Sequence, residues 1–216
     1  MRLIVITPEA LAPGEPRLAR AMLQHGLLTL HLRKPGATRQ QLRDYLAELG
    51  EPWTAAVMLH SHHDLAGDFQ VKGLHYREAD VPAAAPPLPP PPRAGLLQST
   101  SFHSLEQAAR PWGPHLDYAF LSPVFDSISK AGYRSAGFDA AAVRAAAAAP
   151  GAAPLVALGG VTGDNLAAAR AMGFSGAAVL GGVWGAPDPA AAVEALLLAC
   201  ERLGAEAAHA GADPSE

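Results

Sequence analysis

Eight short apolar runs, each ending at polar or glycine-rich residues, constrain the fold of this chain more than any other feature. Their starts lie 17 to 37 residues apart. The runs are almost continuously apolar rather than alternating, which is typical of parallel strands that are covered on both faces. The runs are Leu3–Thr7, Leu28–Arg33, Ala56–His60, Gly73–Tyr76, Gly95–Gln98, Tyr118–Ser122, Leu155–Leu158 and Ala177–Leu180.

Helical patterns separate these runs. Thr38 is suited to cap one helix, and Gly173 is suited to end another. Eight strands joined by crossover helices predict an α/β protein with a (β/α)₈ barrel, the TIM barrel, and an open doubly wound sheet is the alternative. The expected helices are Pro16–His25, Thr38–Leu49, Ser104–Ala109, Asp139–Ala149, Asn165–Met172 and Pro189–Leu203.

One crossover lacks a helical pattern. Val81–Pro92 is rich in proline, which removes helix hydrogen bonds, so we expect this segment to replace the fourth crossover helix. It is interpreted as a rigid connector, with a ligand for a proline-binding domain as the alternative. We expect residues 1–203 to form one barrel domain and residues 204–216 to form a flexible tail.

The amino-acid composition excludes several classes of function for this chain. Half of the residues are hydrophobic, 17% are charged and the net charge is −4, which argues against a disordered chain and a general nucleic-acid binder. The single cysteine, Cys200, cannot form an intramolecular disulfide. No apolar stretch is long enough to span a bilayer, and the first residues resemble a strand rather than a signal peptide. We therefore expect a cytoplasmic protein with no nucleic-acid and no membrane partner.

The residues that end the strands should converge on one rim of the barrel, where such barrels have their active sites. Gly159-Gly160 and Gly181-Gly182 end the last two strands, and backbone N–H groups there commonly bind phosphate. Tight strand-to-helix turns are the alternative explanation for these glycines. Arg33 and Lys130 are the cations best placed for anionic groups, and Lys130 follows two hydroxyls, Ser127 and Ser129.

Several of the nine histidines fall at the same rim. His60 and His62 would share one face of an extended strand, and His31 lies on the neighbouring strand. These three could hold a transition metal, but they follow no dedicated ligand motif, and hydrogen-bonded rim histidines are the favoured interpretation. His75 and His103 are interpreted as structural or orienting residues.

At these same positions the chain resembles the thiamine phosphate synthase/TenI-like superfamily, over roughly residues 1–203. The order and spacing of the motifs are specific for the superfamily and less so for one activity within it. The matching segments are Leu30–Gly36, His63–Ala66, Gly73–His75, Ser101–Ser104, Asp117–Phe125, Ser127–Lys130, Val156–Val161 with Asn165, and Gly176–Leu180.

The resemblance implies a (β/α)₈ barrel that joins a hydroxymethylpyrimidine pyrophosphate to a thiazole phosphate, giving thiamine phosphate and pyrophosphate. It implies that Arg33, Ser101 and Lys130 contact the pyrophosphate. The thiazole phosphate would be bound near Ser127 and Ser129 and by the glycines Gly159, Gly160, Gly181 and Gly182. Asp80 stands at the position of a family Mg²⁺ ligand.

The chain also departs from the synthase pattern. His31 replaces a glutamine, and Pro35 stands at a lysine position, for which Lys34 is expected to substitute. His60-Ser61 replaces an Asn-Asp pair whose aspartate binds Mg²⁺. His60 is expected to contact substrate instead, and a protonated His60 or His62 could neutralise the pyrophosphate directly.

Two alternatives therefore stay open: a TenI-like thiazole phosphate tautomerase and a non-catalytic thiamine-phosphate-binding paralogue. Gly181 replaces a family serine, which removes one phosphate donor, and Pro123 replaces the histidine that the tautomerase uses. We expect small-molecule phosphate and pyrophosphate partners, and a homodimer is compatible with so small a barrel.

Overall fold

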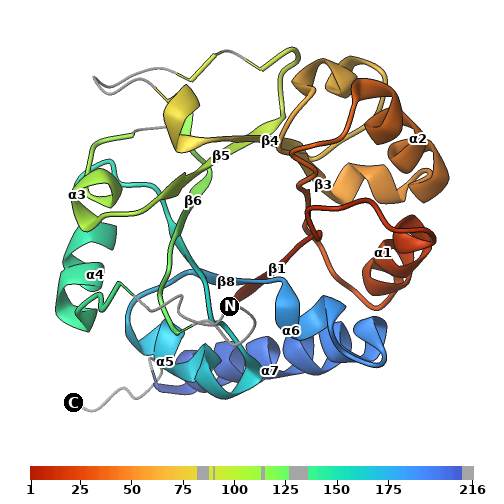
Figure 1. Ribbon diagram of the computed structural model, residues 1–216. Coiled ribbons are helices and arrows are strands. Elements are labelled where there is room, and N and C mark those ends of the chain that lie inside the picture. The colour runs from red at the N-terminus through yellow and green to blue at the C-terminus, as the bar shows by residue number, and fades with distance from the viewer. Residues whose placement is uncertain (82–87, 90, 113–114, 127–135, 211–216) are drawn as a thin grey trace.

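The computed structural model describes residues 1–81, 88–89, 91–112, 115–126 and 136–210, without the side chains of 206–210. Eight parallel strands form a closed barrel in the order β1 to β8, surrounded by helices (Figure 1). The predicted (β/α)₈ barrel is confirmed, and the open sheet is excluded. The strands are β1 (Arg2–Ile6), β2 (Leu30–Leu32), β3 (Val57–Leu59), β4 (Gly73–Tyr76), β5 (Leu97–Phe102), β6 (Tyr118–Leu121), β7 (Leu155–Leu158) and β8 (Gly176–Val179).

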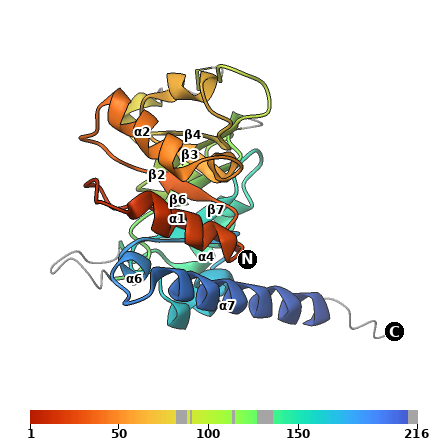
Figure 2. The same cartoon turned by 90° about the vertical axis from the view of Figure 1, so that its right-hand side faces the viewer.

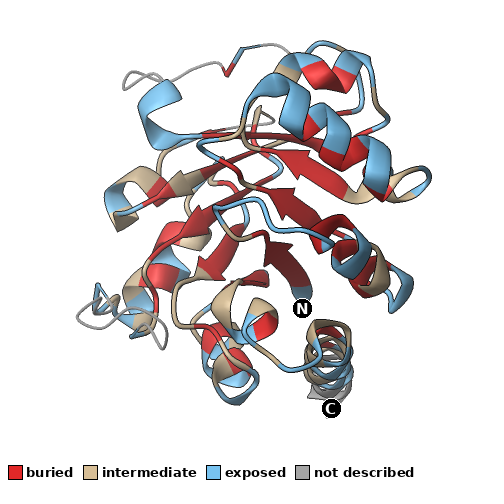
Figure 3. Cartoon of the chain, turned by 45° about the vertical axis from the view of Figure 1, so that its right-hand side comes forward, coloured by how far each residue is buried: buried red, intermediate tan, exposed pale blue. Residues whose placement is uncertain are grey.

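The barrel closes where the first strand pairs with the last. Val5 of β1 lies opposite Val179 of β8 on one side and opposite Leu30 of β2 on the other. Because side chains alternate along a strand, each strand contributes both to the barrel interior and to the layer under the helices. Figure 3 shows the resulting pattern, with buried strands at the centre and exposed outer helix faces. The apolar interior cluster is Ile4, Ile6, Met58, Tyr118, Phe120, Val156 and Ala178.

Local sequence signals explain several helix ends. Thr38 and Gln41 form a capping box at the start of α2, and Asp139 caps α4. Gly173 has a φ of 98° just after α5, as a C-terminal stop requires. The helices are α1 (Glu15–Gln24), α2 (Arg39–Leu49), α3 (Leu105–Ala108), α4 (Ala140–Ala147), α5 (Leu166–Ala171), α6 (Gly181–Trp184) and α7 (Pro189–Ala210), with 3₁₀ turns η1 (Trp53–Ala56), η2 (His63–Gly67), η3 (Glu78–Asp80) and η5 (Gly163–Asn165).

Two boundaries differ clearly from the sequence-based expectation. The strand expected over Gly95–Gln98 instead runs from Leu97 to Phe102, so Ser101 lies inside β5. Helix α7 continues to Ala210, seven residues past the expected end of the barrel domain at residue 203, because its alanine-rich sequence favours helix. Residues 211–216 of the expected flexible tail lie outside the described residues.

The fourth crossover contains the proline-rich segment. The short turn η3 follows β4, and Leu88, Pro89, Pro91 and Pro92 have no regular structure. Residues 82–87 and 90 lie outside the described part of the chain, so the interpretation of the segment as a rigid connector stays a prediction there. None of the described helices is long and apolar enough to cross a membrane.

The two faces of the barrel differ. Strands start on the face that carries the N-terminus and end on the opposite face, which we call the mouth. Helix α7 runs back from the mouth, so its end and the N-terminus lie on the same side (Figure 2). The Met1 ammonium donates a hydrogen bond to the Cys200 carbonyl oxygen in α7 at 3.4 Å. This bond links the N-terminus, just before β1, to the last helix.

Candidate active site at the mouth of the barrel

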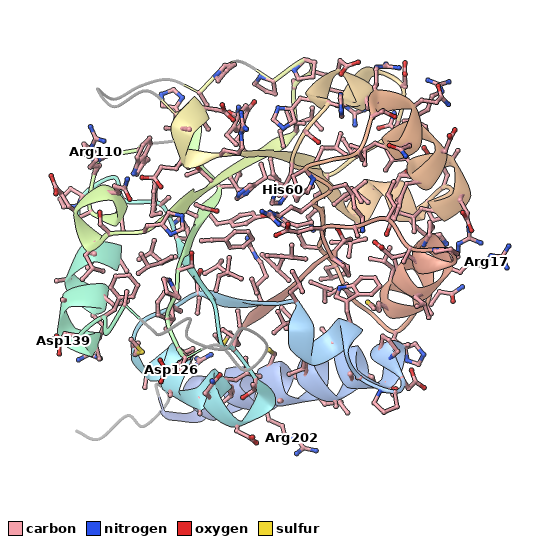
Figure 4. The ribbon with its side chains drawn as sticks, in the orientation of Figure 1. Arg17, His60, Arg110, Asp126, Asp139 and Arg202 are labelled. Carbon is pink, nitrogen blue, oxygen red and sulfur yellow. The ribbon has the colours of Figure 1, made fainter. Side chains whose placement is uncertain are left out.

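One half of the barrel interior is polar. His31 lies on β2, His60 follows β3, and His75 lies on β4. Ser99 and Ser101 of β5 complete this group, and Tyr118 of β6, which also belongs to the apolar interior cluster, bonds to it through its hydroxyl. Figure 4 shows His60 in the middle of the ring of strands.

Hydrogen bonds join these side chains. His60 Nε2 lies 2.8 Å from His31 Nδ1, and His31 Nε2 lies 2.5 Å from the Tyr118 hydroxyl. His75 Nδ1 lies 2.9 Å from Ser99 Oγ, and His75 Nε2 lies 3.1 Å from Ser101 Oγ. The His60 and His75 rings stack with their centroids 4.1 Å apart.

Burial sets the protonation of this group. It lowers the pKa of all three imidazoles and brings that of His75 to about 3, and their mutual repulsion acts in the same direction. Arg33 and Lys72 add positive charge nearby. Burial raises the pKa of Tyr118, which therefore keeps its proton. The histidines are neutral at physiological pH, so they offer lone pairs rather than positive charge.

The structure corrects the expectation that His31 binds substrate. His31 is fully buried, and both ring nitrogens already have partners. It therefore supports His60 from inside the barrel rather than touching a molecule at the mouth. His60 is only half-buried and keeps access to the mouth. The ring of His62 lies outside the group, with Nε2 3.1 Å from the Ala37 carbonyl oxygen.

Arg33 lies at the mouth, directly after β2. Its side chain is 39% exposed, and its guanidinium binds the Glu9 carboxylate at 2.7 Å. Its backbone N–H donates to Thr7 Oγ1 at 2.9 Å, which fixes the backbone between β1 and β2. A guanidinium has five donors, so Arg33 can bind a further anion while it holds Glu9.

The structure contradicts the expectation that Lys34 binds substrate in place of the family lysine. Its ammonium is completely buried and bonds to Glu15 at 2.6 Å. It also donates to the carbonyl oxygens of Pro8 and Ala10 at 2.6 and 2.7 Å. An ammonium has three donors, and these contacts use them all, so Lys34 anchors α1 to the loop after β1.

The described residues do not fit a Mg²⁺ ion held by Asp80. Both carboxylate oxygens of Asp80 accept hydrogen bonds from the Arg77 guanidinium, at 2.7 and 2.8 Å. This guanidinium lowers the pKa of Asp80 and opposes a second cation there. The second carboxylate of the family pattern is replaced by Ser61, whose hydroxyl is buried without a hydrogen-bond partner.

Glycines shape the two turns where phosphate is expected. Gly159 and Gly160 have φ values of 93° and 63°, and a Cβ on Gly160 would lie 2.3 Å from the Asp126 carbonyl oxygen. The tight-turn explanation therefore applies to Gly160. A Cβ on Gly182 would meet no atom within 4 Å. Gly181 and Gly182 open α6, and no backbone acceptor for their N–H groups is found among the described residues.

Ser101 borders both the polar interior and a pocket of about 150 Å³ at the edge of the mouth. The pocket is lined by Glu78, Val81, Thr100, Ser101, Phe102, Gln107, Arg110 and Trp112.

The remaining residues expected to contact the pyrophosphate or the thiazole phosphate lie outside the described residues. They are Ser127, Ser129 and Lys130.

Sequence reasoning missed the connection among His75, Ser99 and Tyr118. His75 of β4 pairs directly with Ser99 of β5, and Ser99 in turn pairs with Tyr118 of β6. Directly paired residues point to the same face of a sheet, so the strand register could have revealed this group. To recognise this group from the sequence, one would have needed the correct residue range of β5.

A closed barrel of eight parallel strands surrounded by helices defines the class of (β/α)₈ proteins, in which the active site lies at the carboxyl ends of the strands. The thiamine monophosphate synthase family model matches residues 3–183, and the chain belongs to this family.

Relatives of known name agree with this assignment. The thiamine-phosphate synthase of Chlorobium luteolum is 31% identical over 201 residues, which cover 90% of this chain and 91% of the relative. Among solved structures, thiamine phosphate pyrophosphorylase from Bacteroides thetaiotaomicron has a TM-score of 0.74 and 27% identity, covering 93% of this chain and 98% of that one. Thiamine phosphate pyrophosphorylase from Pyrococcus furiosus has a TM-score of 0.72 and 26% identity, covering 94% and 96%.

Proposed function

We propose that this chain is a thiamine phosphate synthase, a transferase that joins a hydroxymethylpyrimidine pyrophosphate to a thiazole phosphate. The observation that carries the proposal is the similarity to thiamine-phosphate synthase over nine-tenths of both chains. The resemblance of the individual motifs, including Arg33 and the glycine turns, supports it.

The chemistry requires stabilisation of a leaving pyrophosphate while the two rings are held in line. In this proposal Arg33 supplies a positive charge at the mouth. The Ser101 hydroxyl, which lies beside His75, donates a hydrogen bond to the pyrophosphate, as the resemblance implies. Lys130, Ser127 and Ser129 complete the proposed anion contacts, as the resemblance implies. The N–H groups of Gly181 and Gly182, with the turn at Gly159 and Gly160, would bind the thiazole phosphate.

Mg²⁺ stays a prediction from the family resemblance. Asp80 is bound to Arg77 and Ser61 carries no charge, so neither of these two residues offers the metal an unpaired carboxylate. A cytoplasmic location and a homodimer also stay predictions.

The test is direct product formation. Purified protein is mixed with both substrates, with and without Mg²⁺, and thiamine phosphate is detected after oxidation to fluorescent thiochrome. We expect product, and Arg33→Ala should lower the rate by about 100-fold because one charge-stabilising donor is lost. Arg17→Ala is the matched control, since Arg17 is 83% exposed on α1 and should leave the rate unchanged.

Absence of product from folded protein would reject the synthase proposal. The second candidate is a TenI-like tautomerase, which the lack of a carboxylate pair at Asp80 and Ser61 favours. Proton exchange into the thiazole carboxylate phosphate would support it. Thiamine phosphate binding without either reaction would instead identify a binding-only paralogue. Gain of Mg²⁺-dependent activity in Ser61→Asp would show that the missing carboxylate limits the synthase.

A further inference from the structure

We propose that His31, His60 and His75 form a binding site for a divalent transition metal of the Zn²⁺ class, with one coordination position open to an anionic oxygen. The proposal concerns nitrogen ligands inside the barrel and not the carboxylate positions where the family resemblance implies Mg²⁺. It does not depend on the proposed reaction.

Proximity is the first argument. One nitrogen from each of the three rings lies within 4.8 Å of the other two. A tetrahedral Zn²⁺ with Zn–N bonds of 2.0–2.1 Å separates its ligand nitrogens by roughly 3.3 Å. The 2.8 Å separation of His60 Nε2 and His31 Nδ1 must therefore widen by about half an ångström, and the longer separations must shorten. His60 follows the end of β3 and is half-buried, so its ring can adjust.

Hydrogen bonds provide the second argument, because they orient the rings for metal binding. His31 Nε2–H can donate to the Tyr118 hydroxyl, which leaves the Nδ1 lone pair facing His60. His75 Nδ1–H can donate to Ser99 Oγ, which leaves the Nε2 lone pair free to bind in place of its contact with Ser101. Metal-ligating histidines almost always have such a partner on the second nitrogen.

Charge defines the remaining ligand. The three imidazoles are neutral, and this group contains no carboxylate among the described residues. Arg33 and Lys72 lie close enough to act on it electrostatically. A divalent ion held by three neutral imidazoles would keep its full positive charge, so its open position would favour an anion such as hydroxide or a phosphate oxygen. Histidine nitrogens select Zn²⁺, Co²⁺, Ni²⁺ or Cu²⁺ over Mg²⁺, which prefers oxygen ligands.

The experiment measures metal binding without any enzyme assay. Chelator-treated protein is titrated with Zn²⁺ by calorimetry, and bound metal is counted by mass spectrometry after dialysis. Co²⁺ then replaces Zn²⁺ so that visible absorption reports the coordination geometry. We expect about one equivalent of Zn²⁺ and a four-coordinate Co²⁺ spectrum that changes when inorganic pyrophosphate is added.

Variants separate this site from surface binding. His60→Gln should weaken Zn²⁺ binding by about 100-fold or more, since loss of an outer partner alone costs 10–100-fold. Tyr118→Phe should weaken it by about 10-fold through His31. His103→Gln is the matched control, because His103 is an exposed mouth histidine outside the group, and it should bind as the wild type does. Circular dichroism verifies that each variant is folded.

Three outcomes would overturn the proposal: no stoichiometric Zn²⁺ binding, equal affinities for folded His60→Gln and His103→Gln, or a six-coordinate Co²⁺ spectrum. A Co²⁺ spectrum that does not change when pyrophosphate or phosphate is added would contradict the proposal that one coordination position is open to an anion. The synthase proposal could fail while this site is confirmed, and the reverse also holds, since the two experiments share no readout.

Discussion

The ion pair of Lys34 and Glu15 joins two charged side chains that are 0% and 2% exposed. Lys34→Met keeps most of the side-chain volume but leaves the Glu15 carboxylate without its cation, beside the Tyr45 hydroxyl that donates to it. We expect a loss of about 3–5 kcal/mol in the free energy of unfolding, because an unpaired buried charge is costly. Urea denaturation measures this change.

The double variant Lys34→Met with Glu15→Gln removes both charges and keeps an acceptor for Tyr45. It should recover most of the lost stability. Arg17→Ala tests an exposed pair with Glu48 and should change stability by at most about 1 kcal/mol. A Lys34→Met variant as stable as the wild type would show that the carboxyl of Glu15 is neutral or hydrated.

Lys34 also shows what a sequence cannot supply at the residue scale. Its position after a strand placed it correctly near the mouth. Its partner lies 19 residues earlier in the chain, and α1 brings that partner into place. Arg33, its neighbour, stays half-exposed, because successive residues of an extended chain point to opposite sides.

At the scale of elements, the turn after β7 is the most constrained. Gly160 has a φ of 63° and passes so close to the loop after β6 that a methyl group would collide with the Asp126 carbonyl oxygen. Gly160→Ala should lower the free energy of unfolding by about 1–3 kcal/mol or more, since strain and collision add. Thermal unfolding followed by circular dichroism provides the measurement.

Gly182→Ala is the matched control for this turn. A methyl group there meets open space within α6, and alanine favours a helix by up to about 1 kcal/mol over glycine. The control should therefore be as stable as the wild type or slightly more stable. Equal destabilisation by the two substitutions would contradict the close approach at Gly160.

The strands and helix caps were predictable because local signals specify them. The extent of β5 was not, since Ser99, Thr100 and Ser101 are polar and lie beyond the apolar run that predicts the strand. They continue the strand because their side chains form hydrogen bonds with the neighbouring strand β4. His75 bonds to both serines, and Thr100 Oγ1 donates to the Tyr76 carbonyl oxygen. Ser99 and Tyr118 were missed for this reason, because the polar group draws its members from five neighbouring strands or strand ends, β2 to β6, which meet only through the strand register.

At the scale of the whole molecule, the folded barrel should be stabilised by an anion bound at its mouth. A ligand at about 100 times its Kd raises the free energy of unfolding by about 2.7 kcal/mol, which for a chain of this size corresponds to about 5–10 °C in Tm. We expect a rise of this order with inorganic pyrophosphate in a thermal shift assay. Sodium chloride at matched ionic strength is the control.

Equal shifts with pyrophosphate and with chloride would show that the effect is general charge screening rather than a site. Arg33→Ala should reduce the pyrophosphate shift and leave the chloride baseline unchanged, because Arg33 is an accessible cation at the mouth.

The placement of Met1 and of the end of α7 on the face opposite the mouth also has a practical consequence (Figure 2). A fusion partner or an affinity handle joined to the N-terminus would project away from the polar interior. The protein could then be immobilised on a biosensor surface through that end, with the mouth facing the flow of analyte.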